Sequence, residues 1–429
     1  MSFKMSPKLG ISLVFIVAIG SMLGASIANA TRVQISQDPV SPRADYNIRL
    51  FENLRLDFTG SLSMLYDDNV NTSEDNEEEG WALIPRLRMA LDWPVTPHIK
   101  IGSGMSVGFR KYFSGEGEDD WILTEDGGIS TGINADFFIG EGVLRLSNEF
   151  RRDADTLELL RESGNDDYAR NLNVFSARYS VDLTPYISLI VQGTQENTWV
   201  SPSRYEYQDN VRNTFHINTP YRINRALRLG PYVRWEHIDY EESDNLRPFG
   251  VYLVPEEKAD RTTPEAGISF LYQPEDRLLT VEGSLGYEWM DVDETNPLVD
   301  DEEDGVTGNL TVHYPTSEFT THSLSVSHGR KQAITSLFAN YSEDTRYTYA
   351  IRSNIMSDVT VSGSLSYLNV RESDFGETAD IYRAGVGTSY QFTRKLKGSA
   401  RYEYVTKNSN QAGSDYDRNQ VRLTMHYDF

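Results

Sequence analysis

Histidine, serine and carboxylate side chains are the groups of this sequence that could carry out catalysis, but their spacing matches no catalytic arrangement. The seven histidines form no H-E-x-x-H pair, and no glycine-rich phosphate loop is present. The chain has no cysteine and therefore no thiolate ligand for a metal. His322 and His328 could serve a hydrolase built on strand ends, but a histidine that lines a cavity wall is more often a hydrogen-bonded structural residue. We expect no enzyme, no catalytic residue, no cofactor and no metal.

Acidic residues give the chain a net charge of −24 and gather in runs such as YDDNVNTSEDNEEEG and DVDETNPLVDDEEDG. No comparable run collects Lys and Arg, which argues against nucleic acid as a partner. The second run places Asp291, Asp293, Thr295 and Glu302 at positions 1, 3, 5 and 12 of a calcium loop. The sixth position holds Asn296 where such a loop needs glycine, so the match is weak. A run of this kind is more often a solvated, self-repelling loop.

Stretches of about ten residues that alternate between apolar and polar residues recur throughout the chain. In one of them Leu83, Leu87 and Met89 face one way, and Arg86 and Arg88 face the other. A period of two residues is typical of a strand with one apolar face. Helical spacing is almost absent, so the sequence predicts an all-β fold.

The connections between these stretches alternate between short and long. Short turns are expected at positions such as 94–97 and 356–358, and long polar connections at positions such as 114–120, 197–210, 241–260 and 329–342, with a strand after each. Eight short turns and nine long connections would join about 18 strands, with 16 as the alternative. Outer-membrane barrels have this pattern, with short periplasmic turns and long extracellular loops. We predict a single transmembrane antiparallel up-and-down β-barrel over residues 51–429. A soluble β-sandwich is the alternative, which the unbroken meander disfavours.

Five of the tryptophans mark the expected boundaries of the membrane. Trp81, Trp121, Trp199 and Trp289 stand where a strand meets a long connection, and Trp93 stands beside a short turn. Indole rings prefer the headgroup level of a bilayer. Their positions therefore favour strands that cross a membrane.

The N-terminus has the features of a cleaved signal peptide. Lys4 and Lys8 precede an apolar run that ends in Ala28-Asn29-Ala30. A basic start, a short apolar core and small residues at an A-x-A site direct export and cleavage, and the run is shorter than the ~20 residues that a spanning helix needs. We expect a signal peptide at 1–30, followed at 31–50 by a periplasmic lead-in or the start of the first strand.

The polar face of each strand would enclose the lumen of such a barrel. By alternation, the inward positions carry more Arg and Lys than Asp and Glu, although the whole chain is acidic. A barrel of this size is wide enough for an aqueous channel, and charged walls select solutes by sign. The alternative is that the charges pair across the lumen and close it. The arginines expected to line the pore are Arg86, Arg88, Arg110, Arg178, Arg228, Arg234, Arg352 and Arg401.

The last eight residues, RLTMHYDF, alternate up to the final position. Leu423, Met425, Tyr427 and Phe429 share the lipid-facing parity. This ending resembles the C-terminal recognition signal of outer-membrane barrels. The resemblance implies that the barrel-assembly machinery reads these four residues.

Both end hairpins resemble those of the β-barrel porin type 2 family and of related barrels encoded with exopolysaccharide-export machinery. The first contains SLSMLYDDNVNTS, with a Tyr-Asp-Asp-Asn turn, and the strand WALIPRLRMALDW follows with its proline. The last reads YEYVTKNSNQAGSDYDRNQVRLTMHYDF, where the family's usual loop arginine is replaced by Lys407 or absent. The resemblance implies an outer-membrane barrel that serves export of an anionic exopolysaccharide together with polysaccharide secretion components.

We therefore expect a porin-like channel in the cell outer membrane, in contact with its lipid and lipopolysaccharide. It would pass small solutes or support export of an anionic exopolysaccharide. The alternative function is a surface-exposed structural or adhesion barrel whose acidic loops bind cations or a partner. The sequence leaves the solute and the oligomeric state open.

Overall fold

The computed structural model describes residues 48–49, 53–70, 77–114, 120–122, 131–153, 169–201, 208–241, 246–249, 252–255, 259–274, 279–292, 302–332, 341–373 and 377–429. Within these ranges no helix is long and apolar enough to cross a membrane. The expected signal peptide at 1–30 lies outside the described residues. So do most of the lead-in and the central residues of the expected long connections.

The described residues form strands almost throughout. The strands are β1 (Ile48–Arg49), β2 (Arg55–Asp67), β3 (Gly80–Thr96), β4 (Ile99–Ser114), β5 (Asp120–Ile122), β6 (Thr131–Ile139), β7 (Gly142–Asp153), β8 (Ala169–Asp182), β9 (Ser188–Ser201), β10 (Asn210–Asn218), β11 (Tyr221–Arg222), β12 (Leu227–Tyr240), β13 (Leu246–Phe249), β14 (Tyr252–Pro255), β15 (Arg261–Tyr272), β16 (Thr280–Val292), β17 (Glu302–Pro315), β18 (Thr320–Gln332), β19 (Tyr341–Asn354), β20 (Val359–Glu372), β21 (Thr378–Gln391), β22 (Leu396–Ser409) and β23 (Tyr416–Asp428).

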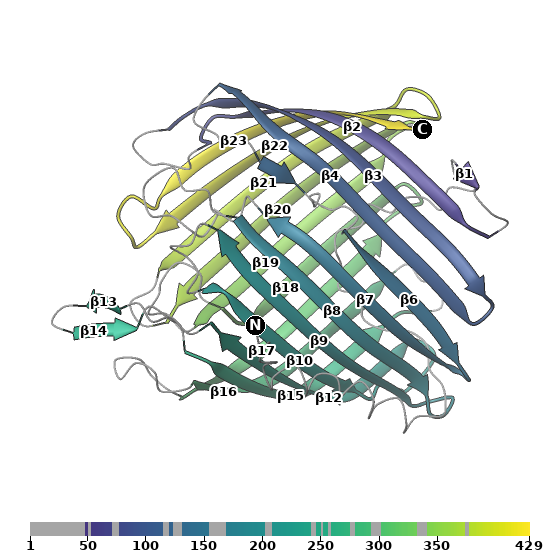
Figure 1. Ribbon diagram of the computed structural model, residues 1–429. Coiled ribbons are helices and arrows are strands. Elements are labelled where there is room, and N and C mark those ends of the chain that lie inside the picture. The colour runs from purple at the N-terminus through teal and green to yellow at the C-terminus, as the bar shows by residue number, and fades with distance from the viewer. Residues whose placement is uncertain are drawn as a thin grey trace, which may run out of the picture.

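One 21-stranded antiparallel sheet contains every described strand except the hairpin β13–β14. Within it β1, β5 and β11 are segments of two or three residues, which leaves 18 strands to form the wall. The wall closes because β23 pairs with β2, from Thr59 opposite Asp428 to Asp67 opposite Gln420. Figure 1 shows these strands wrapped as a tilted ring. The prediction of an all-β antiparallel barrel of 18 strands is confirmed.

Apolar side chains cover the outside of the ring. Leu62, Leu87, Leu285, Leu365 and Leu423, from strands all around the wall, are between 48% and 64% exposed. A soluble protein would turn such a face toward a core, whereas a transmembrane barrel presents it to lipid. The exposed apolar surface therefore favours the membrane barrel over the soluble sandwich.

Tryptophans stand on the same outer surface. Trp81, Trp93, Trp199 and Trp289 are all exposed and lie toward the ends of their strands. Their amphipathic rings suit the two boundaries of a bilayer.

The strands extend further toward the long connections than the alternation pattern predicts. A long connection was expected at 329–342, but β18 continues to Gln332 and β19 begins at Tyr341. Beyond the apolar belt the outward residues become polar, as where Glu343 stands opposite Arg371. The alternation disappears there, while the backbone ladder continues, so sequence periodicity underestimates strand length.

The strand expected after residue 120 is divided. β5 pairs with one part of β4, at 108–110, and β6 pairs with another, at 99–104. Residues 123–130 between them lie outside the described ranges.

A group of polar residues joins the first and last hairpins at the seam between β2 and β23. We call Asp67, Asp68, Asn69, Arg418 and Asn419 the seam clasp. The carboxylate of Asp67, fully buried, accepts bonds from Nε and Nη2 of Arg418 at 3.0 and 2.5 Å. Asn419 donates its backbone N–H and its side-chain amide to the Asp68 carboxylate, at 2.5 and 2.7 Å. Asn69 Nδ2 donates to the carbonyl oxygen of Asp417 at 2.8 Å.

The seam clasp is built from the two stretches that carry the family resemblance, Tyr-Asp-Asp-Asn near the start and Asp-Arg-Asn-Gln near the end. More than 340 residues separate its partners in the chain. Each contact of the clasp joins particular residues of β2 and β23. A shift of one strand along the other would break these contacts, so the clasp favours one alignment of the closing strands.

We expect Arg418→Ala to destabilise the folded barrel by about 3 kcal/mol, because it leaves the buried Asp67 carboxylate without its cation. Urea unfolding from lipid vesicles measures the change. The matched control is Lys100→Ala, whose 3.0 Å pair with Asp92 is half-exposed and should contribute less than about 1 kcal/mol. Adding Asp67→Asn to the Arg418 variant should restore part of the loss. Equal effects of the two alanine variants would contradict the role given to the clasp.

Candidate pore wall

The eight predicted arginines all stand on the inner face of the wall, opposite in parity to the exposed apolar side chains. They are spread around the ring and are not gathered at one point. Arg234 joins a large ion-pair network, and Arg401 pairs with Glu403 at 2.6 Å. Arg178 stands opposite Arg145 in the register of β7 and β8.

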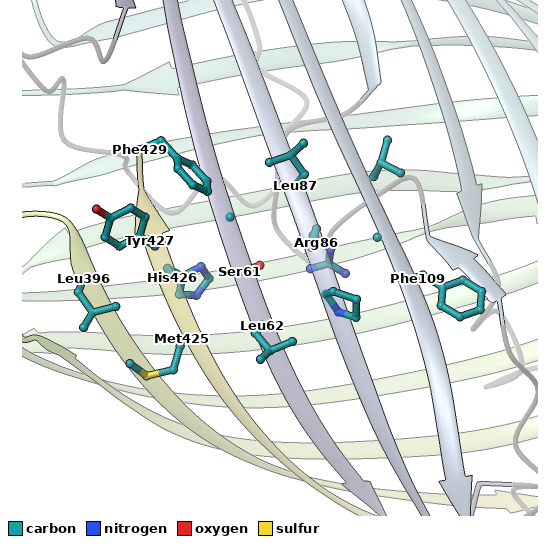
Figure 2. A pocket seen from close by; sticks show the side chains of 14 residues that line it. Ser61, Leu62, Arg86, Leu87, Phe109, Leu396, Met425, His426, Tyr427 and Phe429 are labelled. Atoms are coloured by element: carbon teal, nitrogen blue, oxygen red, sulfur yellow. The ribbon is translucent and has the colours of Figure 1, made fainter.

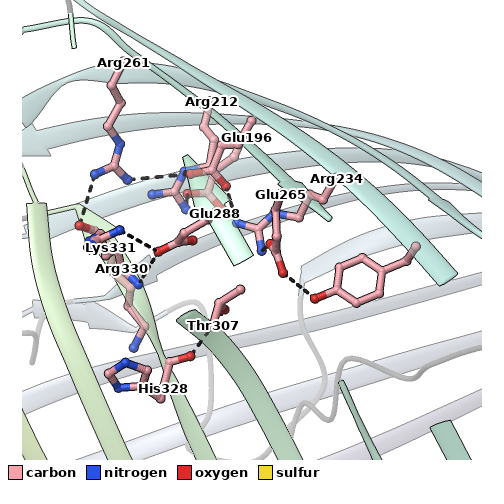
Figure 3. A network of polar contacts seen from close by, with 12 residues as sticks. Glu196, Arg212, Arg234, Arg261, Glu265, Glu288, Thr307, His328, Arg330 and Lys331 are labelled. Carbon is pink, nitrogen blue, oxygen red and sulfur yellow. Dashed lines mark hydrogen bonds and ion pairs between the residues drawn. The ribbon is translucent and has the colours of Figure 1, made fainter. Parts of the chain in front are cut away.

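The largest group of ion pairs among the described residues lies on the inner wall between β9 and β19, and Figure 3 shows most of it. We call it the wall network. Its members are Glu196, Arg212, Arg234, Glu236, Arg261, Glu265, Glu288, Arg330, Lys331 and Asp344.

Glu236 is the centre of the wall network. Its carboxylate lies 2.9 Å from Arg234 Nη2, 3.6 Å from Arg261 Nη2 and 3.9 Å from Arg212 Nε. Arg212 also reaches Glu196 on β9 at 3.5 Å. One carboxylate thus holds three guanidinium groups from β10, β12 and β15 together.

Arg234 and Tyr232 fix the next carboxylate along the wall. Arg234 Nη1 lies 3.2 Å from Glu265 Oε2, and the Tyr232 hydroxyl donates to Glu265 Oε1 at 2.5 Å. Glu265 is itself buried. A buried carboxylate is tolerated where its oxygens have such partners.

The network also connects strands that are not neighbours in the sheet. Arg261 on β15 donates Nη1–H to the carbonyl oxygen of Lys331 on β18 at 3.2 Å, and Lys331 Nζ lies 2.7 Å from Asp344 on β19. Arg330 Nη1 lies 3.6 Å from Glu288 on β16. Contacts that pass over β17 are possible because the inner face is concave.

Gly305 leaves the space in which the Arg330 side chain extends to Glu288. The β17–β18 ladder ends at the pair Gly308 and His328, so the following residues of the two strands separate. A Cβ at Gly305 would lie 2.7 Å from Arg330 Nη2. A larger residue at this position would displace the guanidinium from Glu288.

The wall network has equal numbers of basic and acidic members, five of each. Such an array supplies little net charge but fixes the side chains in place, because most of its members are held by more than one partner. We therefore interpret it as the part of the wall that keeps its shape.

A second region of the inner wall, from β22 to β3, has a different balance. We call Arg86, Arg88, Arg401 and Arg422 the basic sector. Arg401 and Arg422 stand directly opposite each other in the register, an arrangement that is unfavourable for like charges unless an anion lies near, and Glu403, 2.6 Å from Arg401, supplies one such charge. Arg86 extends over Gly108 on β4, where a Cβ would lie 3.1 Å from its Nε.

A buried ion pair lies at the end of this region that is nearest the long connections. Lys407 Nζ lies 2.7 Å from Glu377 Oε1, and the two side chains are 1% and 4% exposed. Buried apolar residues of β20 to β23 form a cluster, namely Leu368, Val370, Ile381, Val405 and Tyr416. Lys407 was considered as a loop residue, but it belongs to β22.

His322 and His328, the candidates for a hydrolase built on strand ends, do not face the lumen. The register puts both on the outer face of β18, opposite in parity to Ser325, which faces inward. His322 Nδ1 lies 2.7 Å from the Tyr349 hydroxyl, and His328 Nδ1 lies 2.8 Å from the Thr345 hydroxyl. Both are hydrogen-bonded to outer-wall side chains.

Only two of the calcium-loop candidates lie within the described residues. Asp291 and Glu302 stand opposite each other in the β16–β17 ladder. Asp293, Thr295 and Asn296 lie outside the described ranges.

The four C-terminal residues of the expected assembly signal all face outward and are 44% to 56% exposed. Three of them, Met425, Tyr427 and Phe429, line a shallow apolar groove of about 650 Å³ across the seam (Figure 2). Leu62 and Leu87 stand on its far side. The ring of Phe429 lies over Gly60, where a Cβ would be 3.0 Å from it.

Sequence alternation identified most of the inner-wall charges but missed Arg261, Arg330 and Lys331. Arg330 and Lys331 fall in a stretch that was assigned to a long connection. Arg330 also has the parity of the outer face and reaches Glu288 because the ladder has ended. Extending the alternation a few residues into each connection would have found Lys331.

We expect Glu236→Gln to lower the free energy of unfolding by about 2 kcal/mol, because three guanidinium groups lose their shared counter-charge. Glu282→Gln is the matched control, since Glu282 also faces inward, on β16, but lies outside the wall network. Its effect should stay within about 0.5 kcal/mol. Urea unfolding from vesicles compares the two, and equal losses would show that Glu236 is not the centre of the network.

Three comparisons with known proteins bear on the family. Residues 260–429 match the family described as "Putative beta-barrel porin 2". A search of the curated proteins gives no match.

Several solved structures are similar over most of this chain. The outer membrane protein opdK from Pseudomonas aeruginosa is 12% identical, covering 87% of this chain and 99% of its own, with a TM-score of 0.45. OccK2 (OpdF) from the same organism, solved with glucuronate, is 10% identical, covering 88% and 99%, with a TM-score of 0.48. A loop-deletion mutant of OmpT from Vibrio cholerae is 10% identical, covering 88% and 100%, with a TM-score of 0.39.

The segment that matches the family runs from the start of β15 to the last strand and contains the last hairpin. The first hairpin lies outside it. The similarity to the beta-barrel porin 2 family therefore covers residues 260–429 of the chain.

Proposed function

We propose that this protein is a channel of the outer membrane that favours anionic solutes. The observation that carries the proposal is the sorting of side chains across a closed wall, with exposed apolar residues outside and an excess of arginine and lysine over acid inside. Such a wall excludes lipid from its centre and holds charge where a solute would pass. The finer proposal is that the solute is an anionic exopolysaccharide, exported together with polysaccharide secretion components.

The two regions of the inner wall would have different tasks. The wall network is electrically balanced and would maintain the shape of the lumen. The basic sector would attract the anion, since guanidinium groups bind carboxylates and phosphates in a fixed planar geometry. Several arginines spread along the wall give many weak contacts, which allow a solute to leave as well as to enter.

Replacing Arg86 and Arg88 together by glutamine should reduce the anion-to-cation permeability ratio by a factor of about two to three, because two fixed positive charges leave the lumen. The reversal potential across a planar bilayer under a salt gradient measures this ratio. Arg371→Gln is the control, since Arg371 faces outward at the end of β20. A barrel that never conducts would overturn the channel, and an unchanged ratio would overturn the role of these arginines.

A short anionic oligosaccharide should block the open-channel current reversibly, and a neutral one of equal length should block it much less. The block should weaken as salt rises, because at about 1 M the screening length falls to roughly 3 Å. It should also weaken in the Arg86/Arg88 variant. Equal block by the neutral sugar would contradict selection by charge, although it would leave the channel itself intact.

We also propose that the barrel-assembly machinery reads Leu423, Met425, Tyr427 and Phe429. Deleting Phe429 should reduce the amount of folded barrel in the outer membrane severalfold in cells, since the outward aromatic row is shortened. Refolding of the same variant into vesicles should be nearly normal. A matching loss in both settings would indicate a stability effect and contradict recognition.

A further inference from the structure

One arginine on the inner wall, outside both the wall network and the basic sector, is surrounded by hydroxyl side chains. Arg346 on β19 stands opposite Ser327 on β18. The next inward residue of β19, Thr348, stands between Ser325 on β18 and Ser366 on β20. We call Arg346, Ser325, Ser327, Thr348 and Ser366 the serine–arginine patch.

Arg346 carries a charge that no protein group balances. It faces the lumen, with the parity opposite to the outward-facing Tyr347, and its side chain is exposed. Within the described ranges it makes no hydrogen bond and no ion pair. By contrast, Arg383 on β21 and Arg401 on β22 both contact Glu403, at 3.5 and 2.6 Å. The positive charge of Arg346 is therefore available to a solute.

The four hydroxyl groups of the patch are also available. Each belongs to a partly exposed side chain, and none has a hydrogen-bond partner in the part of the chain that the structure describes. Other hydroxyls of the inner wall are paired. The Ser63 and Thr424 hydroxyls lie 2.8 Å apart, and Ser342 donates to Asp344 at 3.0 Å. The patch thus differs from those parts of the wall in that its hydroxyls can bind a ligand without breaking a protein contact.

The spacing allows one ligand to contact the arginine and the hydroxyls together. On one face of a sheet, directly opposite side chains are about 5 Å apart and diagonal ones about 7–8 Å apart. Ser327 is directly opposite Arg346, and Ser325 and Ser366 are diagonal to it on either side. The hydroxyls therefore lie around the base of the arginine, whose long side chain extends beyond them into the lumen.

The two kinds of group in the patch select a ligand with two kinds of chemistry. A guanidinium only donates hydrogen bonds and binds an anionic oxygen pair in a planar arrangement. A serine or threonine hydroxyl both donates and accepts, as sugar hydroxyls do. A simple inorganic anion would use the arginine and leave the hydroxyls as acceptors without donors. A neutral sugar would use the hydroxyls and leave the charge unbalanced.

We propose that the serine–arginine patch binds one acidic sugar residue. Its acid group lies on the guanidinium of Arg346, and its hydroxyls bond to the serines and to Thr348. The site rests on the proposed function in one respect, since the sugar has to enter the lumen. Binding at equilibrium does not require conduction, so the site and the channel can be tested separately.

Calorimetry on the full-length barrel in detergent tests the site, with digalacturonate as the probe and its dimethyl ester as the matched ligand. The ester keeps the sugar hydroxyls and removes the charge. Digalacturonate should bind about tenfold more tightly than the ester, because a charge-assisted contact is lost. Equal binding of the two ligands would overturn the assignment of an acidic sugar.

The variant Arg346→Gln should bind digalacturonate about tenfold more weakly and should no longer distinguish it from the ester. It should unfold in urea like the unmodified barrel, because the arginine gives up no protein contact. Arg371→Gln, which removes the same charge from the outer face of β20, should bind both ligands as before. A preference for the acid that survives in Arg346→Gln would overturn the role of this arginine.

The hydroxyls are tested by Ser325→Ala combined with Ser366→Ala. Both ligands should bind several-fold more weakly to this variant, because both use the hydroxyls, while sulfate should bind as before. Thr388→Ala removes an exposed hydroxyl from the outer face of β21 and should change nothing. Unchanged binding of both sugars would reduce the patch to a simple anion site and overturn the proposal.

The outcomes separate this site from the channel. A barrel that binds digalacturonate in preference to its ester but never conducts would support the patch and overturn the channel. A barrel that conducts but shows no such preference would overturn the patch and leave the channel standing.

Discussion

The constraint on which the structure depends is that backbone N–H and C=O groups inside a bilayer must find partners within the protein. A strand cannot satisfy them alone, so each strand needs two neighbours and the sheet must close. The pairing of β23 with β2 provides that closure. The seam clasp holds the long-connection end of the same seam, where Arg418 and Asp67 fix the register of the first and last hairpins.

The curvature of the closed sheet also determines which charged side chains on its inner face come into contact. In an open sheet, Arg261 on β15 and Lys331 on β18 would be separated by two strands, but the concave inner face brings them within hydrogen-bond distance. The wall network therefore results from curvature as well as from alternation. Its balanced composition keeps the side chains fixed, and the basic sector across the lumen retains a positive excess. A chain with a net charge of −24 can in this way enclose a basic interior.

The outer surface is also determined by the bilayer. Leu, Val and aromatic residues form a belt around most of the ring, bounded by outward tryptophans and tyrosines.

The sequence by itself determined the architecture, the approximate strand number and the face of each strand. Period-two alternation along Leu83 to Met89 is a local property of the sequence. In a bilayer, strands with such an alternation must close into a barrel, because their backbone groups need partners. The inward parity of Arg86, Arg234 and Glu236 followed from the same count. Only the tertiary structure decided which of these charges meet. Arg330 reaches Glu288 because a ladder ends and Gly305 leaves space, and His322 faces lipid because the register of β18 turns it outward. Contacts across strands depend on register and curvature, which no local pattern records.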